Sequence, residues 1–317
     1  MKSIIYAWII PAVLAMIVIS NPAGARDWWQ ESSGRDSFDQ KTVNLSKPMG
    51  SIETAVRVNW VDDYIEVIAG GTVDNSQAVN MAHALSMAQK TARHLAYEKL
   101  AETISGISIT SDATYDRELM VDANLKTSLS ALIRGAQVIE EKHEQLADGS
   151  IWATVRLGIN IVGPGSLMTS TQPWFDNLPR TQLKPRTSSS AHGQVPVQPA
   201  EKQTRDYTGL IIDAGGLNIR PAMAPRILGQ DGEVLYEVHD VDQDYLTRYG
   251  MAGYARSVEQ ARGLERVGAN PMIIKGQEAT GNAACDIEIS RDDAAALIMA
   301  GAGSSFLKES RVVIVVN

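Results

Sequence analysis

The sequence predicts an α+β protein with two domains, each a mainly antiparallel or mixed sheet with helices packed on one face. Segments that alternate between apolar and polar residues come in pairs separated by turn residues, which is typical of hairpins. Between these pairs lie patterns with apolar residues three and four positions apart, which predict amphipathic helices. The order predicted for the first half, β-β-α-β-α-β-β, is that of helices covering one face of an antiparallel sheet.

The first 25 residues have the pattern of a secretory signal peptide. Lys2 is followed by an apolar run over residues 4–19, and the small residues Ala23 and Ala25 precede Arg26. This pattern predicts cleavage between Ala25 and Arg26. The alternative is an uncleaved membrane anchor, which is disfavoured because a proline interrupts the run and no basic cluster follows it.

Charge and cysteine content exclude several classes of function. The chain has a net charge of −8, and we do not expect nucleic acid as a partner because phosphate binding needs an accessible basic face. Cys285 is the single cysteine, so no intramolecular disulfide can form. We interpret Cys285 as a small buried residue rather than a nucleophile, since neither sequence neighbour is a base.

The first predicted domain, residues 51–163, follows a flexible lead-in at residues 26–50. Its first hairpin turns at Asp62-Asp63, and a long helix is predicted after Ser76. The apolar face of that helix is rich in alanine, which lets it lie close against a sheet. The members of this face are Ala78, Ala82, Leu85, Ala88, Ala92, Leu95 and Ala96.

The rest of this domain completes the sheet. We expect a strand at residues 107–111 and a second helix that ends at Gly135. Two alternating segments at residues 138–146 and 151–161 predict a second hairpin. They are joined by the Asp-Gly dipeptide at residues 148–149, a strong turn signal.

Residues 164–206 are predicted to be an extended linker between the domains. They hold six of the chain's 12 prolines and a run of serines, a composition that keeps a chain extended. The middle of this segment is basic, with five Lys and Arg residues against Glu201 alone. That charge suits contact with an anionic envelope surface, although a solvated linker is the simpler interpretation.

The second predicted domain, residues 207–317, has its own sequence of strands and helices. We expect strands at 207–213, 225–228 and 233–238, helices near 243–249 and 258–264, strands at 271–278 and 285–289, a helix over 292–299 and a strand at 311–316. Because the last strand is apolar, we expect the end of the chain to form part of the sheet.

Several motifs of the first domain carry a family resemblance. They are the hairpin end at 67–71, the alanine-rich helix at 88–101, the segment Gly106–Thr110, the segment Ile133–Ala136 and the Asp148-Gly149 turn. In these motifs the domain resembles the LPP20 family of bacterial envelope proteins, which is related to the N-terminal domain of flagellar assembly protein T. The second domain resembles the C-terminal part of longer members at residues 209–214, 221–227 and 311–316.

The resemblance implies a periplasmic or outer-membrane-associated protein, in some members a part of flagellar basal-body assembly. It supplies no catalytic residues. The lipoprotein members carry an acylated cysteine that this chain lacks, so direct lipid anchoring is not expected.

Two local patterns imitate metal sites. His143-Glu144 begins like a zinc-protease motif, but Ala147 stands where the second histidine is required, and the segment is predicted to be a strand. Asp240 and Asp242 belong to a run of alternating aspartates that imitates a calcium loop. The required glycine and glutamate are missing there, so we interpret one of these aspartates as a helix cap. We therefore expect no metal, no cofactor and no catalytic residue.

These observations predict a non-catalytic exported envelope protein. It would act as a structural or adaptor component in flagellar basal-body or outer-membrane assembly, with envelope proteins as partners and peripheral contact with the outer membrane or peptidoglycan. The alternative is a periplasmic small-ligand or peptidoglycan-binding module, in which Trp152, Trp174 and Phe175 would supply stacking surface. An enzyme is a third class, which the sequence does not favour.

Overall fold

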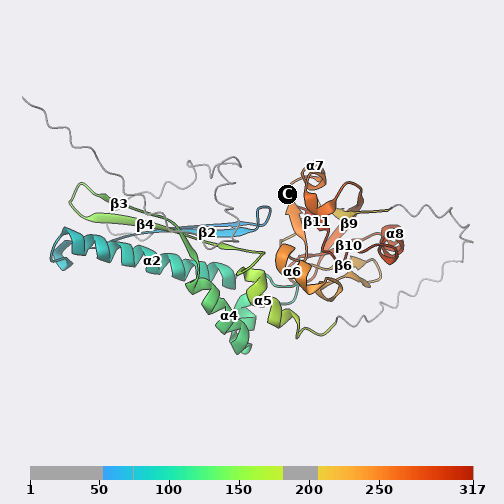
Figure 1. The fold of residues 1–317 in the computed structure, drawn as a ribbon, viewed down its shortest axis with the longest axis horizontal. Helices are drawn as coiled ribbons and strands as arrows, with labels where there is room; N and C mark the ends of the chain where they lie inside the picture. Colours follow the sequence, from blue (N-terminus) through green and yellow to red (C-terminus); the bar gives the residue numbers. More distant parts are fainter. Residues whose placement is uncertain (1–52, 74, 181–205, 317) are drawn as a thin grey trace, which may run out of the picture. The chain divides into compact units, whose positions relative to one another are not determined.

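The structure is a computed structural model, and it describes residues 53–73, 75–180 and 206–316. These residues lie in one compact unit, Leu45–Asn317, which contains two sheets (Figure 1). The predicted α+β class is confirmed, because one sheet is antiparallel, the other is mixed, and helices pack against both.

Several predictions concern parts of the chain outside the described residues. They are the signal peptide with its cleavage site at Ala23, Ala25 and Arg26, the lead-in, and the linker at residues 181–205. Within the described ranges, no helix is both long enough and apolar enough to cross a bilayer.

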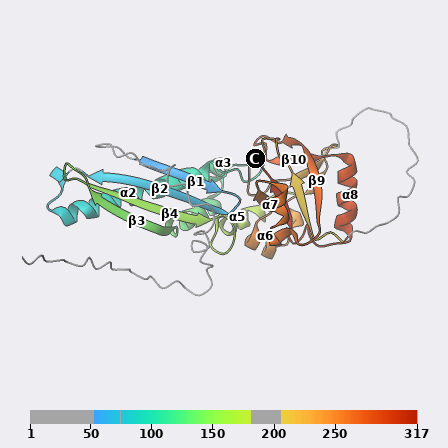
Figure 2. The same cartoon turned by 90° about the horizontal axis from the view of Figure 1, so that it is seen from above.

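The first sheet has four antiparallel strands in the order β1-β2-β4-β3 (Figure 2). Their bounds are β1 (Glu53–Asn59), β2 (Tyr64–Val73), β3 (Gln137–Gln145) and β4 (Ile151–Asn160). Both predicted hairpins are confirmed, with turns at Asp62-Asp63 and Asp148-Gly149. Asp63 has φ 58° and Gly149 has φ 85°, left-handed conformations that aspartate tolerates and glycine favours.

Helix α2 (Met81–Ser105) lies along one face of this sheet (Figure 1). Its buried residues recur every four positions and are mostly alanine: Ala84, Ala88, Ala92, Ala96, Leu100 and Ile104. The predicted face is right at positions 88, 92 and 96, but Ala82 is exposed. The helix also begins later than predicted from Ser76, because the Asn80 side chain caps it by accepting from the His83 amide at 2.9 Å.

The strand predicted at residues 107–111 does not form. Its only ladder contact is one isolated bridge between Ser108 and Thr114, and the Ile109 amide donates to the Ala113 carbonyl at 2.9 Å. The apolar residues of this segment are buried in a loop, which is why they imitate a strand in the sequence. The helices that follow are α3 (Tyr115–Val121) and α4 (Ala123–Arg134), the latter ending at Gly135 as predicted.

Part of the predicted linker is helical, so the prediction of an extended chain from residue 164 onward is wrong there. Helix α5 (Leu167–Phe175) begins at Ser166, whose hydroxyl accepts from the Thr169 amide at 3.2 Å. Four of its residues are buried: Leu167, Met168, Thr171 and Phe175. Pro173 lies in the last turn, where one missing N–H is outweighed by this buried face, which packs with α4.

The second sheet has seven strands in the order β7-β6-β10-β9-β5-β11-β8. Its strands are β5 (Gly209–Asp213), β6 (Ile227–Gly229), β7 (Val234–Tyr236), β8 (Gly253–Ala255), β9 (Pro271–Thr280), β10 (Asp286–Ile289) and β11 (Val312–Val315). Its helices are α6 (Gln243–Tyr249), α7 (Val258–Arg262) and α8 (Arg291–Ala302), with 3-10 turns η3 (Val238–Asp240) and η4 (Glu265–Val267); a further turn, η2 (Asn75–Gln77), precedes α2. The three-residue strand β8 was not predicted, since it is too short to show a period.

The two predicted domains share one apolar core. In β5, Ile211 packs on the side of α7 and η4, while Leu210 and Ile212 belong to a larger cluster. That larger cluster also contains Ile65 of β2 and Leu100 of α2. Both faces of β5 are therefore buried, which explains why its sequence is continuously apolar rather than alternating.

Candidate functional site: the junction between the two sheets

The loop that was predicted as a strand finds its hydrogen bonds in the other half of the chain. The Met223 amide donates to the Ser108 carbonyl at 3.1 Å, and the Ala224 amide donates to the Ile109 carbonyl at 2.8 Å. The backbone carbonyls of Ser108 and Ile109 thus find their hydrogen-bond donors in a segment more than 100 residues away. The local sequence could not reveal these partners.

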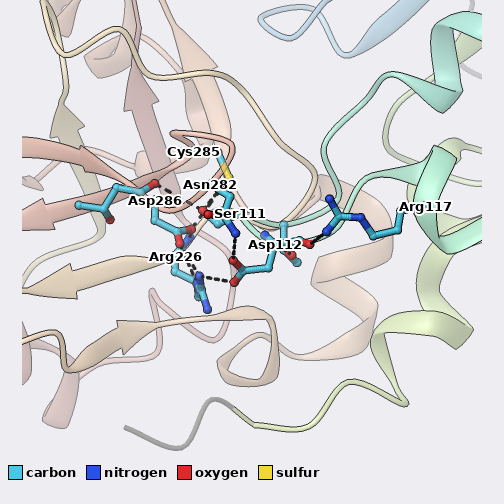
Figure 3. A network of polar contacts seen from close by, with 9 residues as sticks. Ser111, Asp112, Arg117, Arg226, Asn282, Cys285 and Asp286 are labelled. Atoms are coloured by element: carbon cyan, nitrogen blue, oxygen red, sulfur yellow. Dashed lines mark hydrogen bonds and ion pairs between the residues drawn. The ribbon is translucent and has the colours of Figure 1, made fainter. Parts of the chain in front are cut away.

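A buried ion pair stands at the centre of this junction (Figure 3). Arg226 donates to one carboxylate oxygen of Asp286 from Nε at 2.9 Å and from Nη2 at 2.6 Å, and its backbone amide donates to the other oxygen at 2.9 Å. Burial alone would lower the pKa of Arg226, but the hydrogen bonds and the charge of Asp286 raise it. The Arg226 guanidinium therefore stays charged.

Asp112, from the loop between α2 and α3, attaches to this pair from outside. Its carboxylate accepts from Arg226 Nη2 at 3.2 Å and from Asn282 Nδ2 at 3.0 Å, and its carbonyl accepts from Arg117 Nη1 at 2.8 Å (Figure 3). The Asp112 side chain is 61% exposed, whereas the Asp286 side chain is 1% exposed. We therefore expect Asp112 to add little stability and Asp286 to be indispensable.

Cys285 lies beside this network and is buried, as the sequence predicted. Its sulfur lies 3.3 Å from the Ser111 hydroxyl. Burial raises the pKa of the Cys285 thiol to about 11, so it remains protonated at neutral pH. Gly281, at φ 81°, allows this packing, because a Cβ at that position would overlap the Ser111 side chain.

A second junction forms where the tip of the β1–β2 hairpin meets a partly buried arginine, Arg266. Arg266 donates to the carbonyls of Ser310 at 2.7 Å, Tyr249 at 2.6 Å and Gly250 at 2.9 Å, and also to the Ser310 hydroxyl. Burial lowers the pKa of Arg266. The acceptors of Arg266 are neutral carbonyl and hydroxyl groups, so none of these hydrogen bonds brings a carboxylate to balance its charge.

Asp63, at the hairpin tip, supplies the nearby negative charge. Crowding by protein atoms raises the pKa of Asp63 to about 7; the charge of Arg266 opposes this rise, and that of Asp62 adds to it. Trp60, just after β1, also meets the second sheet through an edge-to-face contact with Tyr254, with ring centroids 5.6 Å apart. The hairpin tip thus joins the two sheets through both a titratable group and an aromatic contact.

The residues of the two patterns that resemble metal sites do not come together in the structure. His143 and Glu144 lie on β3, an exposed strand, where the helical spacing of a zinc motif cannot arise. Asp242 is at the N-cap position of α6, but its carbonyl rather than its side chain accepts from the helix, and Asp240 instead accepts from the Glu237 amide. The parts of the chain that the structure describes contain no group of three potential metal ligands.

The three residues predicted as a stacking surface, Trp152, Trp174 and Phe175, instead contact other residues of the protein. Trp152 is buried against Gly70, and Phe175 is buried in an edge-to-face contact with Trp174. Trp174 donates from its indole nitrogen to Glu118 at 3.2 Å. Trp152 and Phe175 therefore offer no surface for a ligand to stack on.

Two cavities of about 460 Å³ open at the surface of the described unit. One is lined by Val58 and Trp60 at the end of β1, by Lys99 of α2 and by Arg220. The other lies between α2, α3 and α4 and is lined mainly by apolar residues, with Met120 at its edge. Neither cavity includes the Arg226–Asp286 pair.

Sequence reasoning missed the residues of both junctions. Arg226 and Asp286 are 60 positions apart, and Asp63 and Arg266 are separated by most of the chain. The sequence carries only weak signals for them: Asp63 belongs to a predicted turn, and Arg226 lies within a motif that supports the family resemblance.

Comparison with protein families gives a match within the second half of the chain. The family model for the second domain of Treponema pallidum Tp0624 matches residues 209–317, roughly a third of the chain. The matched region begins with β5 and contains the whole second sheet, including Arg226, Asp286 and Arg266. No curated protein matches the chain. The second sheet is therefore similar to a domain of a Treponema protein, and the first sheet lies outside that match.

Proposed function

We propose that this protein is an exported, non-catalytic adaptor of the bacterial cell envelope that acts in flagellar basal-body or outer-membrane assembly. The observation that carries the proposal is the placement of exposed apolar side chains at two separate positions. At the end of α3, Met120 and Val121 are 79% and 78% exposed; on α8, Ile298 and Met299 are 55% and 71% exposed. Exposed apolar patches are typical of protein–protein contacts.

The junctions support the adaptor function in a second way. Arg226 and Asp286 belong to the second sheet, while Asp112 and the hairpin tip at Asp63 come from the first. An adaptor must transmit position from one binding surface to another, which requires its two regions to be joined rather than loosely tethered. The signal-peptide pattern and the LPP20 resemblance supply the envelope location.

Cross-linking in intact cells of the native organism tests the proposal. We expect mass spectrometry to identify flagellar ring or outer-membrane proteins bound to the wild-type protein. Replacing Met120 and Val121 by serine should remove part of this set, while the control Val79→Ser, at a valine that is 88% exposed and lies outside α3 and α8, should not. If the wild-type protein captures no envelope component, the adaptor function is wrong.

A second candidate function is the binding of a small anionic ligand such as a peptidoglycan fragment. It rests on Arg220, an exposed cation at the cavity beside β1 whose side chain has no hydrogen-bond partner among the described residues. Peptidoglycan fragments should then raise the melting temperature of the wild-type protein but not of Arg220→Ala, because a ligand stabilises the state that binds it. No shift in the wild-type protein would contradict this function.

A further inference from the structure

Helix α8 is apolar on its buried side and also on part of its solvent-exposed side. Ala294 and Leu297 face the protein and are buried. On the solvent side, Ile298 and Met299 are largely exposed, at 55% and 71%. The helix packs against β6 and β7 at the edge of the second sheet (Figures 1 and 2). A surface helix normally carries polar residues on its outer side, so the outer side of α8 is unusual.

The exposed residues form one regular stripe. Ala295, Ile298, Met299 and Ala302 occupy positions i, i+3, i+4 and i+7 of the helix, and we call these four residues the α8 stripe. This spacing places them on a single face, as in helices that pack against another helix. The two large residues lie at the centre and the two alanines at the ends, where small side chains allow a second helix to approach closely.

We propose that the α8 stripe pairs with the α8 stripe of a second copy of this chain, with the two helices antiparallel about a two-fold axis. The stripe reads almost the same in both directions, and an axis between residues 298 and 299 makes it complementary to itself. Ile298 then faces Met299 of the second copy, and Ala295 faces its Ala302. A two-fold interface requires this kind of self-complementary patch.

Charge also favours a second copy at this position. The chain has a net charge of −8, so two copies repel each other over most of their surface. From Ala294 to Leu307 there is no charged residue, which leaves a neutral surface where two copies can meet without repulsion. The antiparallel arrangement also brings the positive end of each helix dipole beside the negative end of the other.

The size of the stripe sets the strength of the contact. Stable dimers bury about 800 Å² on each partner, and a 12-residue helix is only about 18 Å long. A single stripe supplies part of the area that a stable dimer needs. We therefore expect a weak dimer with a dissociation constant of about 100 µM, which would be populated where copies are held close together in an assembly.

Sedimentation analysis of the purified mature chain over about 5–500 µM tests the proposal. The wild-type protein should shift from monomer toward dimer within this range. Ile298→Lys and Met299→Glu should each weaken dimerisation at least tenfold. The control Val79→Lys, a matched change at an exposed valine outside α8, should leave it unchanged.

Mixing the two variants distinguishes a two-fold pairing from general stickiness. In a mixed dimer, Lys at 298 of one copy faces Glu at 299 of the other, and Met299 faces Ile298, so the mixture should dimerise more strongly than either variant alone. A monomeric wild-type protein across the whole range would overturn the proposal. So would a mixture that stays monomeric while both variants keep their circular dichroism spectra. Because no envelope partner is present, failure here leaves the adaptor function standing.

Discussion

The two sheets reach their stability by different means. In the first sheet, each hairpin pairs strands that are neighbours in sequence, and the alanine face of α2 covers β2 and β4. In the second sheet, the central strand β5 pairs with β9 and β11, which lie far along the chain. The second sheet also holds the buried carboxylate of Asp286 and the partly buried guanidinium of Arg266. The first sheet also contains a distant pairing, β2 with β4, and a cross-strand ion pair, Glu66 with Arg156 at 3.2 Å. The difference is that both hairpins of the first sheet form between sequence neighbours, whereas the centre of the second sheet is assembled from strands far apart in the chain.

The largest expected effect is on the buried ion pair of the second sheet. Asp286→Ala removes the carboxylate that accepts three hydrogen bonds from Arg226 and leaves this partly buried cation with only the exposed carboxylate of Asp112 as its partner. We expect a loss of about 3 kcal/mol in the free energy of unfolding, measured in urea. A loss below about 1 kcal/mol would mean that apolar packing, rather than the ion pair, stabilises this sheet as it does the first.

In the first sheet the most sensitive position should be a glycine rather than a charge. A Cβ at Gly70 would overlap the ring of Trp152 on the neighbouring strand β4. We expect Gly70→Ala to cost about 2 kcal/mol in unfolding free energy because the ring cannot move away without disturbing the sheet. Gly303→Ala is the control, since a Cβ there meets no atom within 4 Å. If the two variants were equally stable, the Trp152 ring would have to be able to move away from the added methyl group at no cost.

Asp63 should make the stability of the hairpin-tip junction depend on pH. Its pKa is about 7 in the folded protein and about 3.8 in an unfolded chain, so the folded state binds the extra proton between these values. Stability should therefore fall as pH rises from 4 to 7, and the loss should be complete above pH 7. The full shift would correspond to about 4 kcal/mol, but Asp63 is only partly buried and solvent screens its charge. Asp63→Asn should therefore be more stable than the wild-type protein by about 1–2 kcal/mol at pH 8 and equal to it near pH 4.

Thermal unfolding of both proteins across this pH range measures the effect of Asp63. Asparagine also tolerates the left-handed conformation at φ 58°, so the substitution adds no backbone strain. A difference between the two proteins that does not change with pH would exclude Asp63 as the titrating group.

The smallest expected effect is at the exposed contact between the sheets. Asp112→Ala removes a carboxylate that is 61% exposed and bonded to Arg226 and Asn282. We expect a change of about 0.5 kcal/mol in unfolding free energy, screened further by salt. A change as large as that of Asp286→Ala would show that the junction, and not the second sheet alone, depends on this network.

The sequence predicted elements well where their signals are local. The turn at Asp148-Gly149, the burial of Cys285 and the alanine face at Ala88 and Ala92 are all confirmed. The predictions from sequence were wrong where contacts between distant parts of the chain determine the conformation. Residues 107–111 have the composition of a strand but bond to the backbone of Met223 and Ala224, and the proline-rich segment holds α5 because a buried face outweighs Pro173.

By itself, the sequence determined the α+β class, both hairpins of the first sheet and most of the strands of the second, because turn chemistry and hydrophobic period act within a few residues. Only the tertiary structure decided that the two halves share one core, and that Asp112, Arg226 and Asp286 meet. The physical reason is distance along the chain: a charged residue carries no local sign of the partner that will compensate it. The outer stripe of α8 shows the same limit, since its apolar residues could be recognised as exposed only after the inner face was known to be buried.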